Sequence, residues 1–397
     1  MTVLASGAPA DQMKFETAWA QFERCTGITV RYQAGSPLES LASSGTATAR
    51  PPDIAVVAQP VLLQKLVKAG AVKPAPADVV SNVDRYWNPV WKSYGTVNDT
   101  LYAAPLGATV KSLVWYSPKV FAAKGYAIPT TWADLWTLSE RMASDGVKPW
   151  CGGLASGTAT GWPATDWLEE TVLRLSGGDV YDKWISHDVK FDSPAITEAM
   201  DQVARWMKNS RYVNAGIGPV ASVATTPVAS VGRPVLDGTC GMLQASASYA
   251  TQWPTFKPDV RVAAGGDVFA FYLPSVDATE DCVETVGDFV VAFADRPEVQ
   301  EFQSFVSSAT FATERARLGN WVSANNGVEP GSYRDAISAL SARHLTDPTA
   351  LVRFDASELM PAEVGSGAMF AQLTSWFAVN KPTKDVLDAI DLAWPSS

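Results

Sequence analysis

Histidine is almost missing from this chain, and without it most acid–base and metal chemistry loses its usual residue. Only His187 and His344 occur among 397 residues. The HExxH zinc motif, the GxGxxG dinucleotide loop and the GxxxxGK[ST] phosphate loop are absent as well. The four cysteines are widely spaced, and none forms the CxxC pair of a zinc ribbon or a thioredoxin-type site. The sequence therefore argues against the common metal, nucleotide and redox enzymes.

Positive charge is also scarce. The chain has 31 Lys and Arg against 41 Asp and Glu, which gives a net charge of −10. An acidic surface repels phosphate backbones and anionic lipid headgroups, so we expect no nucleic-acid partner and no membrane-surface partner. No run approaches the roughly 18 uncharged apolar residues that a membrane span needs. These features exclude an integral membrane protein.

Three questions stay open at the level of composition. The segment after Met1, TVLASGAP, has neither the basic nor the apolar region of a signal peptide, so the protein is either cytosolic or has lost such a peptide. Four cysteines fit two disulfides in an exported protein or four buried thiols in a cytosolic one. The 15 Trp, 11 Tyr and 15 Phe indicate either a large aromatic core or a surface for stacking on flat ligands.

Strand and helix patterns alternate along the chain, which is typical of α/β units with a parallel sheet. The first strand, TVLAS, is followed by a helix that ends at Gly27, and a buried strand at 52–60 is followed by a helix that ends at Gly70. Thr131 and Asp134 have capping-box spacing at the start of another helix. The length predicts two or three domains. Further helices are expected at 166–175, 195–207, from 297 and across 369–394, with strands at 111–118 and 286–293.

No catalytic motif emerges from the remaining polar residues. Ser156 in GGLASG is out of register with the GxSxG nucleophile elbow. His187 beside Asp188 is better explained as a solvated loop than as an acid–base pair. Many Asp and Glu pairs could serve as glycosidase carboxylates, but nothing singles out two of them. We therefore assign no catalytic residue.

Several long segments are similar to the bacterial extracellular solute-binding proteins of sugar ABC importers, the family of maltose-binding protein. They are FERCTGITVRY at 22–32, PPDIAVVAQPVLLQKLVKAGAV at 51–72 and LYAAPLGATVKSLVWYSPKVFAAKGYAIPTTWADL at 101–135. Ser117 stands where the family usually has Asn. The segments at 148–170 and 353–370 resemble the α-glucoside-binding branch, although Gln244 lies in a segment that is often richer in basic residues. The resemblance extends over nearly the whole chain.

This resemblance implies an α/β, two-lobed periplasmic-binding-protein-like fold with a ligand cleft between the lobes. Each lobe would be a mostly parallel sheet flanked by helices and would be discontinuous in sequence. Lobe one would comprise 1–110 and 280–327, and lobe two would comprise 111–279 and 328–397. The resemblance also implies that Cys151 and Cys240 form a disulfide in lobe two. Cys25 and Cys282 would then form a second disulfide by elimination.

A sugar offers apolar C–H faces and a ring of hydroxyls, so its site needs aromatic platforms and convergent hydrogen-bonding groups. Ser36 and Gln59 lie at strand-to-helix turns, the usual ligand position in open α/β sheets, although Gln59 could simply start a helix. Thr109 and Lys111 share one face of a strand, and a lysine in the apolar SLVWY strand is costly unless it is paired or faces the ligand. Asp288 interrupts a buried strand, where it is either a ligand group or a structural hydrogen-bond acceptor.

The family segments supply the other candidate ligand residues. Trp162 could instead be a core residue, Asp355 could be a partner of Arg353 or a helix cap, and Phe370 could be required by its helix core. Trp321 could stack on a pyranose face. The complete set of these candidates is Thr160, Trp162, Asp166, Gln244, Tyr249, Trp321, Arg353, Asp355 and Phe370.

The sequence thus predicts a non-enzymatic, exported binding protein, periplasmic or lipid-anchored, that passes a sugar to the membrane permease subunits of an ABC importer. The ligand would be an α-glucoside or a maltodextrin-like oligosaccharide, captured by closure of the lobes, and the protein would be a monomer. No cofactor and no metal are expected. The alternatives are a carbohydrate-active enzyme and a binding protein for a modified or glycerol-linked sugar.

Overall fold

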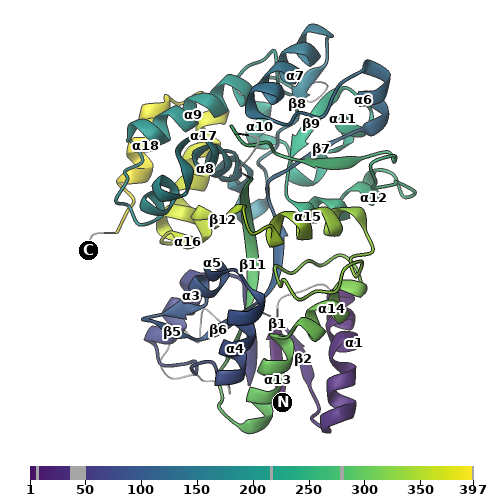
Figure 1. Ribbon diagram of the computed structural model, residues 1–397. Helices are drawn as coiled ribbons and strands as arrows, with labels where there is room; N and C mark the ends of the chain where they lie inside the picture. The colour runs from purple at the N-terminus through teal and green to yellow at the C-terminus, as the bar shows by residue number, and fades with distance from the viewer. Residues whose placement is uncertain (6–8, 36–50, 215–217, 278–280, 396–397) are drawn as a thin grey trace. The chain divides into compact units, whose positions relative to one another are not determined.

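The computed structural model describes residues 1–5, 9–35, 51–214, 218–277 and 281–395. The chain forms two compact units, and each is assembled from two separate stretches of sequence (Figure 1). Unit 1 comprises Met1–Thr109 and Val286–Pro348, and unit 2 comprises Val110–Thr285 and Thr349–Ser397. The chain therefore passes between the units for the third time at 348–349, whereas the sequence analysis places this passage at 327–328. Ser36, a candidate ligand residue, lies outside the described residues.

Unit 1 contains parallel strands and the helices that follow them. Strand β1 pairs in parallel with β2 and with β3, while β11 joins β3 in antiparallel orientation. The elements are β1 (Thr2–Ala5), α1 (Pro9–Thr26), β2 (Arg31–Ala34), β3 (Ile54–Val57), α3 (Pro60–Lys68), α4 (Ala77–Tyr86), α5 (Pro89–Tyr94), β4 (Thr96–Val97), β5 (Thr100–Leu101), β6 (Ala103–Val110), the later part of β11 (Cys282–Ala292), α13 (Pro297–Val306), α14 (Ala309–Arg317) and α15 (Ala336–Thr346).

The core of unit 1 follows the helical spacing seen in the sequence. Trp19 and Phe22 of α1 both pack edge-on against Phe302 of α13, with ring centroids 5.5 and 5.3 Å apart. Gly27, with φ 73°, and Gly70, with φ 65°, follow the ends of α1 and α3 in the left-handed conformation that glycine adopts without a steric penalty. The predicted helix ends are therefore confirmed.

Unit 2 has its own sheet and a larger helical layer. In this sheet, with the order β10-β7-β9-β8, β7 pairs in antiparallel orientation with β10 and β9, and β8 pairs in parallel with β9. Its elements are β7 (Leu113–Tyr116), α6 (Pro118–Lys124), α7 (Trp132–Ser144), β8 (Lys148–Trp150), η1 (Gly157–Ala159), α8 (Trp162–Ile185), α9 (Pro194–Met207), α10 (Ser222–Thr225), η2 (Val228–Ser230), α11 (Arg233–Leu236), β9 (Cys240–Gln244), η3 (Ala247–Thr251), α12 (Trp253–Phe256), β10 (Phe269–Tyr272), the start of β11, β12 (Leu351–Phe354), α16 (Ala356–Leu359), η4 (Glu363–Met369), α17 (Phe370–Ala378) and α18 (Thr383–Asp391).

The antiparallel pairs of unit 2 differ from the mostly parallel sheet that the resemblance implies for each lobe. The physical reason is that β7 pairs with β9 and β10, which come much later in the chain, so the orientation depends on how distant segments meet. The expected class of two discontinuous α/β units is confirmed. The capping box at the start of α7 is also present, with Thr131 accepting from the Asp134 amide.

Most tryptophans belong to the cores. Trp150, Trp167 and Trp206 pack together in unit 2 with ring centroids 4.9 to 5.9 Å apart. Helices α8, α9, α17 and α18 pack side by side around this unit's core (Figure 1). Ten of the 15 tryptophans are buried, so the first of the two compositional interpretations, a large aromatic core, accounts for most of them.

Candidate functional site

A buried lysine in unit 2 is surrounded by carboxylates. Lys111 follows strand β6 and is only 6% exposed. Its Nζ lies 2.6 Å from Asp166 Oδ1 of α8 and 3.5 Å from Glu284 Oε1 of β11, and it also donates to Asp355 Oδ2 just after β12. The sequence analysis requires Lys111 to be paired or to face the ligand, and the ion pairs satisfy this requirement.

Asp166, Glu284 and Asp355 could hold a metal ion by their geometry alone, because one oxygen of each lies within 4.8 Å of the others. The Lys111 ammonium, however, already contacts all three carboxyl groups. The positive charge that this arrangement needs is thus supplied by a side chain of the protein.

More charged residues from α8 extend the cluster around Lys111. Glu169 accepts hydrogen bonds from the backbone amides of Ala356 and Ser357 at the start of α16, at 2.8 and 3.2 Å. Glu170 pairs with Arg174 one helical turn later. We call these seven residues the buried charge cluster: Lys111, Asp166, Glu169, Glu170, Arg174, Glu284 and Asp355.

Burial and mutual repulsion raise the pKa values of the carboxyl groups in this cluster, and the charge of Lys111 lowers them. Burial raises the pKa of Asp166 to about 7, despite the opposing effect of Lys111. Burial, reinforced by the charge of Glu170, raises the pKa of Glu284 well above its usual value. Burial also opposes ionisation of Asp355, but Lys111 outweighs it and lowers the pKa of that carboxyl. The cluster therefore contains both a firmly ionised acid and acids that retain protons.

Three of the candidate ligand residues line one small cavity in unit 2, next to this cluster. Trp162, Gln244 and Tyr249 come from α8, β9 and η3, and the cavity between them has a volume of about 20 Å³. Such a space accommodates about one water molecule, so a sugar would have to lie against the accessible side of these residues. Trp162 is only half-buried, and the Lys111 Nζ lies 5.9 Å from its ring centroid. The Gln244 Nε2 lies 3.5 Å from the Lys111 carbonyl oxygen.

The loop before Trp162 is held by hydrogen bonds of the Thr160 side chain, and at Gly161 it comes close to the backbone of Phe370. Thr160 Oγ1 accepts from the Ser156 amide at 3.0 Å and donates to the Gly157 carbonyl at 2.8 Å. Gly161 has a φ of 117°, and an ideal Cβ on it would lie only 2.4 Å from the Phe370 carbonyl oxygen. Thr160 and Phe370 are thus placed beside Trp162 and contribute to the shape of this region.

Replacing Gly161 with alanine is expected to reduce the free energy of unfolding by about 1–3 kcal/mol, because the new methyl group meets backbone in a strained conformation. Chemical denaturation measures this loss. Gly157→Ala is the matched control, since Gly157 also has a positive φ of 58° but nothing lies within 4 Å of its Cβ position. If the two variants lose equal stability, the contact with Phe370 is not responsible.

Asp288 and Trp321 lie together in unit 1. An ideal Cβ on Gly107 would lie 2.6 Å from Trp321 Nε1 and 3.5 Å from Asp288 Oδ2, so both side chains occupy the space beside Gly107. Within the described part of the chain, the Trp321 indole N–H has no hydrogen-bond partner. Burial raises the pKa of Asp288 to about 6. This pair offers unit 1 a hydrogen-bond donor and an acceptor for a ligand.

Three further candidates lie elsewhere. Gln59 directly precedes α3 and is exposed, and its carbonyl accepts from the first turn of that helix. Thr109 is the last residue of unit 1 before the chain enters unit 2. Arg353 of β12 pairs with Asp182 of α8 through two bonds of 2.7 and 2.9 Å. Arg353 therefore has a carboxylate partner within unit 2, and that partner is not Asp355.

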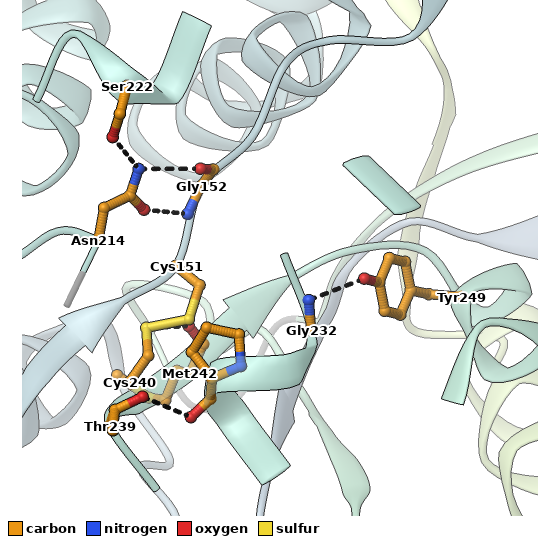
Figure 2. The surroundings of a disulfide bond; sticks show 10 residues. Cys151, Gly152, Asn214, Ser222, Gly232, Thr239, Cys240, Met242 and Tyr249 are labelled. Atoms are coloured by element: carbon orange, nitrogen blue, oxygen red, sulfur yellow. Dashed lines mark hydrogen bonds between the residues drawn. A yellow bond between two sulfur atoms is a disulfide. The ribbon is translucent and has the colours of Figure 1, made fainter. Parts of the chain in front are cut away.

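The predicted disulfide between Cys151 and Cys240 is confirmed (Figure 2). The cysteines lie at the end of β8 and the start of β9, two parallel neighbours, with 6.0 Å between their Cα atoms. Asn214 fixes the next residue, since its amide group bonds both the N–H and the carbonyl of Gly152, at 2.8 and 3.1 Å.

The second predicted disulfide is wrong. Cys25 is an exposed thiol on α1 of unit 1, whereas Cys282 is a buried thiol at the start of β11 in unit 2. An assignment by elimination assumes that every cysteine is oxidised, and here the two remaining side chains belong to different units.

The sequence analysis missed Glu169, Glu170, Arg174 and Glu284 of the buried charge cluster. Glu284 could have been found from the sequence. A carboxylate inside the apolar strand β11 is costly unless it is paired or faces a ligand, as is Lys111 in its own apolar segment. Charged residues on α8 gave no such signal, because helical charges usually mark a solvent-facing side.

Comparison with known proteins agrees with this architecture. Residues 5–313 match the family model described as bacterial extracellular solute-binding protein. The alpha-glucosides-binding periplasmic protein AglE of Rhizobium meliloti is 30% identical over 100% of this chain and 87% of its own length. The osmoprotective compounds-binding protein GgtB of Synechocystis is 28% identical over 100% of this chain and 92% of its own length.

Solved structures share the fold at low identity. The bacterial solute receptor AcbH, described with a preference for β-D-galactopyranose, superposes with a TM-score of 0.78 at 18% identity, covering 98% of this chain and 97% of that one. RafE from Streptococcus pneumoniae gives a TM-score of 0.77 at 14% identity, covering 99% and 97%. Two discontinuous α/β units of this kind define a two-domain solute-binding protein.

The chain belongs to the bacterial extracellular solute-binding protein family. Its relatives are substrate-binding proteins of transporters rather than enzymes. Among the described residues, no helix is both long and apolar enough to span a bilayer.

Proposed function

We propose that this protein is the sugar-binding component of an ABC importer and that its ligand is an α-glucoside or a related oligosaccharide. The observation that carries the proposal is the similarity over the whole chain to a relative named for binding alpha-glucosides. Two other relatives, matched over shorter segments, are named as ABC transporter extracellular-binding proteins. The same relationship supports an exported location and a membrane permease as partner. The proposal also includes a monomeric state and a location that is either periplasmic or lipid-anchored.

The chemistry of unit 2 supports a neutral saccharide. Trp162 offers an aromatic face, and Gln244 next to it carries an amide that suits paired hydroxyls. The Tyr249 hydroxyl accepts from the Gly232 amide at 2.9 Å (Figure 2). It donates its only proton to the Val228 carbonyl at 3.1 Å, so it is already satisfied within unit 2. The cations of the buried charge cluster are paired with carboxylates, so they offer little to an anionic ligand.

Unit 1 supports the same ligand class with separate residues. Asp288 accepts hydrogen bonds, and the Trp321 indole donates one. A site built from such groups discriminates by leaving a buried polar group unpaired when a ligand hydroxyl is missing.

Isothermal titration calorimetry with maltose, trehalose, sucrose, a maltodextrin series and a glucosylglycerol tests the proposal. Saturable binding of at least one of these sugars is the expected result. The glucosylglycerol is included because one relative is named for osmoprotective compounds. Failure of every carbohydrate to bind would contradict the proposal, and turnover of a chromogenic α-glucoside would favour a carbohydrate-active enzyme.

Trp162→Ala is expected to weaken binding of the sugar identified in this way by about 2 kcal/mol, which is roughly a 30-fold rise in Kd. The loss follows from removing the aromatic face. Trp394→Ala is the matched control, because Trp394 stacks on His187 with ring centroids 4.1 Å apart and lines no part of the Trp162 cavity. Equal affinity in wild type and Trp162→Ala would remove Trp162 from the ligand site.

A further inference from the structure

The buried charge cluster contains more acids than bases. Five carboxyl groups surround two cations, Lys111 and Arg174, and each of the seven residues is at most 6% exposed. If every carboxyl were ionised, the cluster would hold three uncompensated negative charges away from water, which is strongly unfavourable. Asp355 with Lys111 and Glu170 with Arg174 already form two close ion pairs. The surplus carboxyls must therefore hold protons.

Glu284 differs from the other four carboxyls in its hydrogen bonding. Both of its carboxyl oxygens lack a hydrogen-bond partner among the described residues, and the side chain is fully buried. By contrast, Asp166 and Asp355 accept from Lys111, and Glu169 accepts from two backbone amides. A carboxylate without donors is the most costly member to ionise.

The cluster is connected to the proposed ligand residues through Lys111. The Lys111 Nζ lies 3.5 Å from Glu284 and 5.9 Å from the centre of the Trp162 ring. The Lys111 carbonyl lies 3.5 Å from the Gln244 Nε2. Any change of charge at Glu284 acts on the ammonium that lies against Trp162.

We propose that Glu284 holds a proton at neutral pH and is a positioning residue for the Trp162 region, so that its ionisation weakens ligand binding. This inference rests on the proposed sugar-binding function. Ionised Glu284 attracts Lys111 and repels the neighbouring carboxylates, which shifts the ammonium relative to the Trp162 ring. The ligand affinity is therefore highest while Glu284 is protonated.

The direction of the pH effect follows from the groups that face Glu284. Burial and the negative charges of α8 raise its pKa, and Lys111 only partly opposes them. Folded protein thus binds more protons than unfolded protein above the ordinary glutamate pKa, and stability falls as the pH rises through that window. The charged groups that act on Glu284 are Glu170, Lys111, Glu169 and Asp166, together with Asp355, one oxygen of which lies within 4.8 Å of a Glu284 oxygen. Arg353, paired with Asp182, lies opposite Glu284 on β12, and Arg174 and Tyr272 act on the neighbouring Glu170.

Glu284→Gln tests the proposal, because glutamine has the shape of protonated glutamate and cannot ionise. The Kd for the sugar that binds in the calorimetric screen is measured from pH 6 to pH 9. At pH 6 the variant and the wild type are expected to bind with similar affinity. At pH 9 the variant is expected to bind about twofold to thirtyfold more tightly than the wild type. Glu363→Gln, an exposed carboxylate change in the same unit, is expected to keep the wild-type profile.

A Glu284→Gln protein with the wild-type pH profile of Kd would overturn the inference while leaving sugar binding intact. If no sugar binds, the proposed function fails, and two ligand-free readouts still test the proton. Thermal unfolding is expected to lose less stability between pH 6 and pH 9 in Glu284→Gln than in wild type. The infrared band of a protonated carboxylic acid is expected in wild type at pH 7, and its absence would refute the proposal even if the variant did not fold.

Discussion

Replacing Lys111 with methionine is expected to reduce the free energy of unfolding by about 3–5 kcal/mol, because it removes one partner of a buried ion pair and leaves the other charges uncompensated. Asp166, Glu284 and Asp355 all contact the Lys111 ammonium and are at most 3% exposed. Burial alone would lower the pKa of Lys111, but these carboxyls outweigh it and raise that pKa well above its usual value. The lysine is therefore charged at neutral pH.

Urea denaturation at neutral pH measures the effect of Lys111→Met. The matched control is Lys384→Met in the same unit, because the Lys384 side chain is 77% exposed and pairs with Asp388, whose side chain is 39% exposed. Exposed ion pairs contribute little, so this control is expected to resemble the wild type. The variant should also recover part of its stability on acidification, since protonation neutralises the orphaned carboxylates. Equal stability of Lys111→Met and wild type would show that the ammonium does not stabilise the cluster.

Removing the disulfide is the second large change. Converting Cys151 and Cys240 to serine is expected to cost about 2–5 kcal/mol, because the bond closes a long loop of 89 residues in the unfolded chain. Both cysteines are 1% exposed and lie next to the backbone that Asn214 and Met242 hold. The loss therefore falls on unit 2, close to the residues that line the Trp162 cavity.

Differential scanning calorimetry with and without reductant measures this loss. Wild-type protein is expected to melt at a lower temperature when it is reduced, and the double serine variant is expected to be insensitive to reductant. Cys25→Ser controls for thiol chemistry, because Cys25 is an exposed thiol in unit 1. A wild type whose melting temperature is unchanged by full reduction would contradict the prediction.

Local sequence patterns predicted the elements of the fold well. Helical spacing placed α1, and the pair Thr131 and Asp134 placed the start of α7. These signals are reliable because caps and amphipathic faces depend on residues close together in the chain. The orientation of strands in unit 2 depends on how distant segments meet, and no local pattern encodes it.

The candidate site was only partly predictable for a related reason. Lys111 was singled out because it interrupts an apolar strand, and Trp162, Gln244 and Tyr249 were placed by family resemblance. The carboxylates of α8 were missed except for Asp166, because the helix is buried on all sides from Ala164 to Arg174 and its charges therefore do not mark solvent. Burial of this kind is set by packing of unit 2 as a whole.

The buried charge cluster also constrains the order in which the protein can mature. Lys111 and Glu284 come from opposite ends of the first stretch of unit 2, and Asp355 comes from the second stretch, which begins at residue 349. Until that stretch has been synthesised, Glu169 lacks the amides of Ala356 and Ser357, and Lys111 lacks Asp355. Nascent unit 2 therefore cannot reach its native state on the ribosome ahead of its C-terminal stretch.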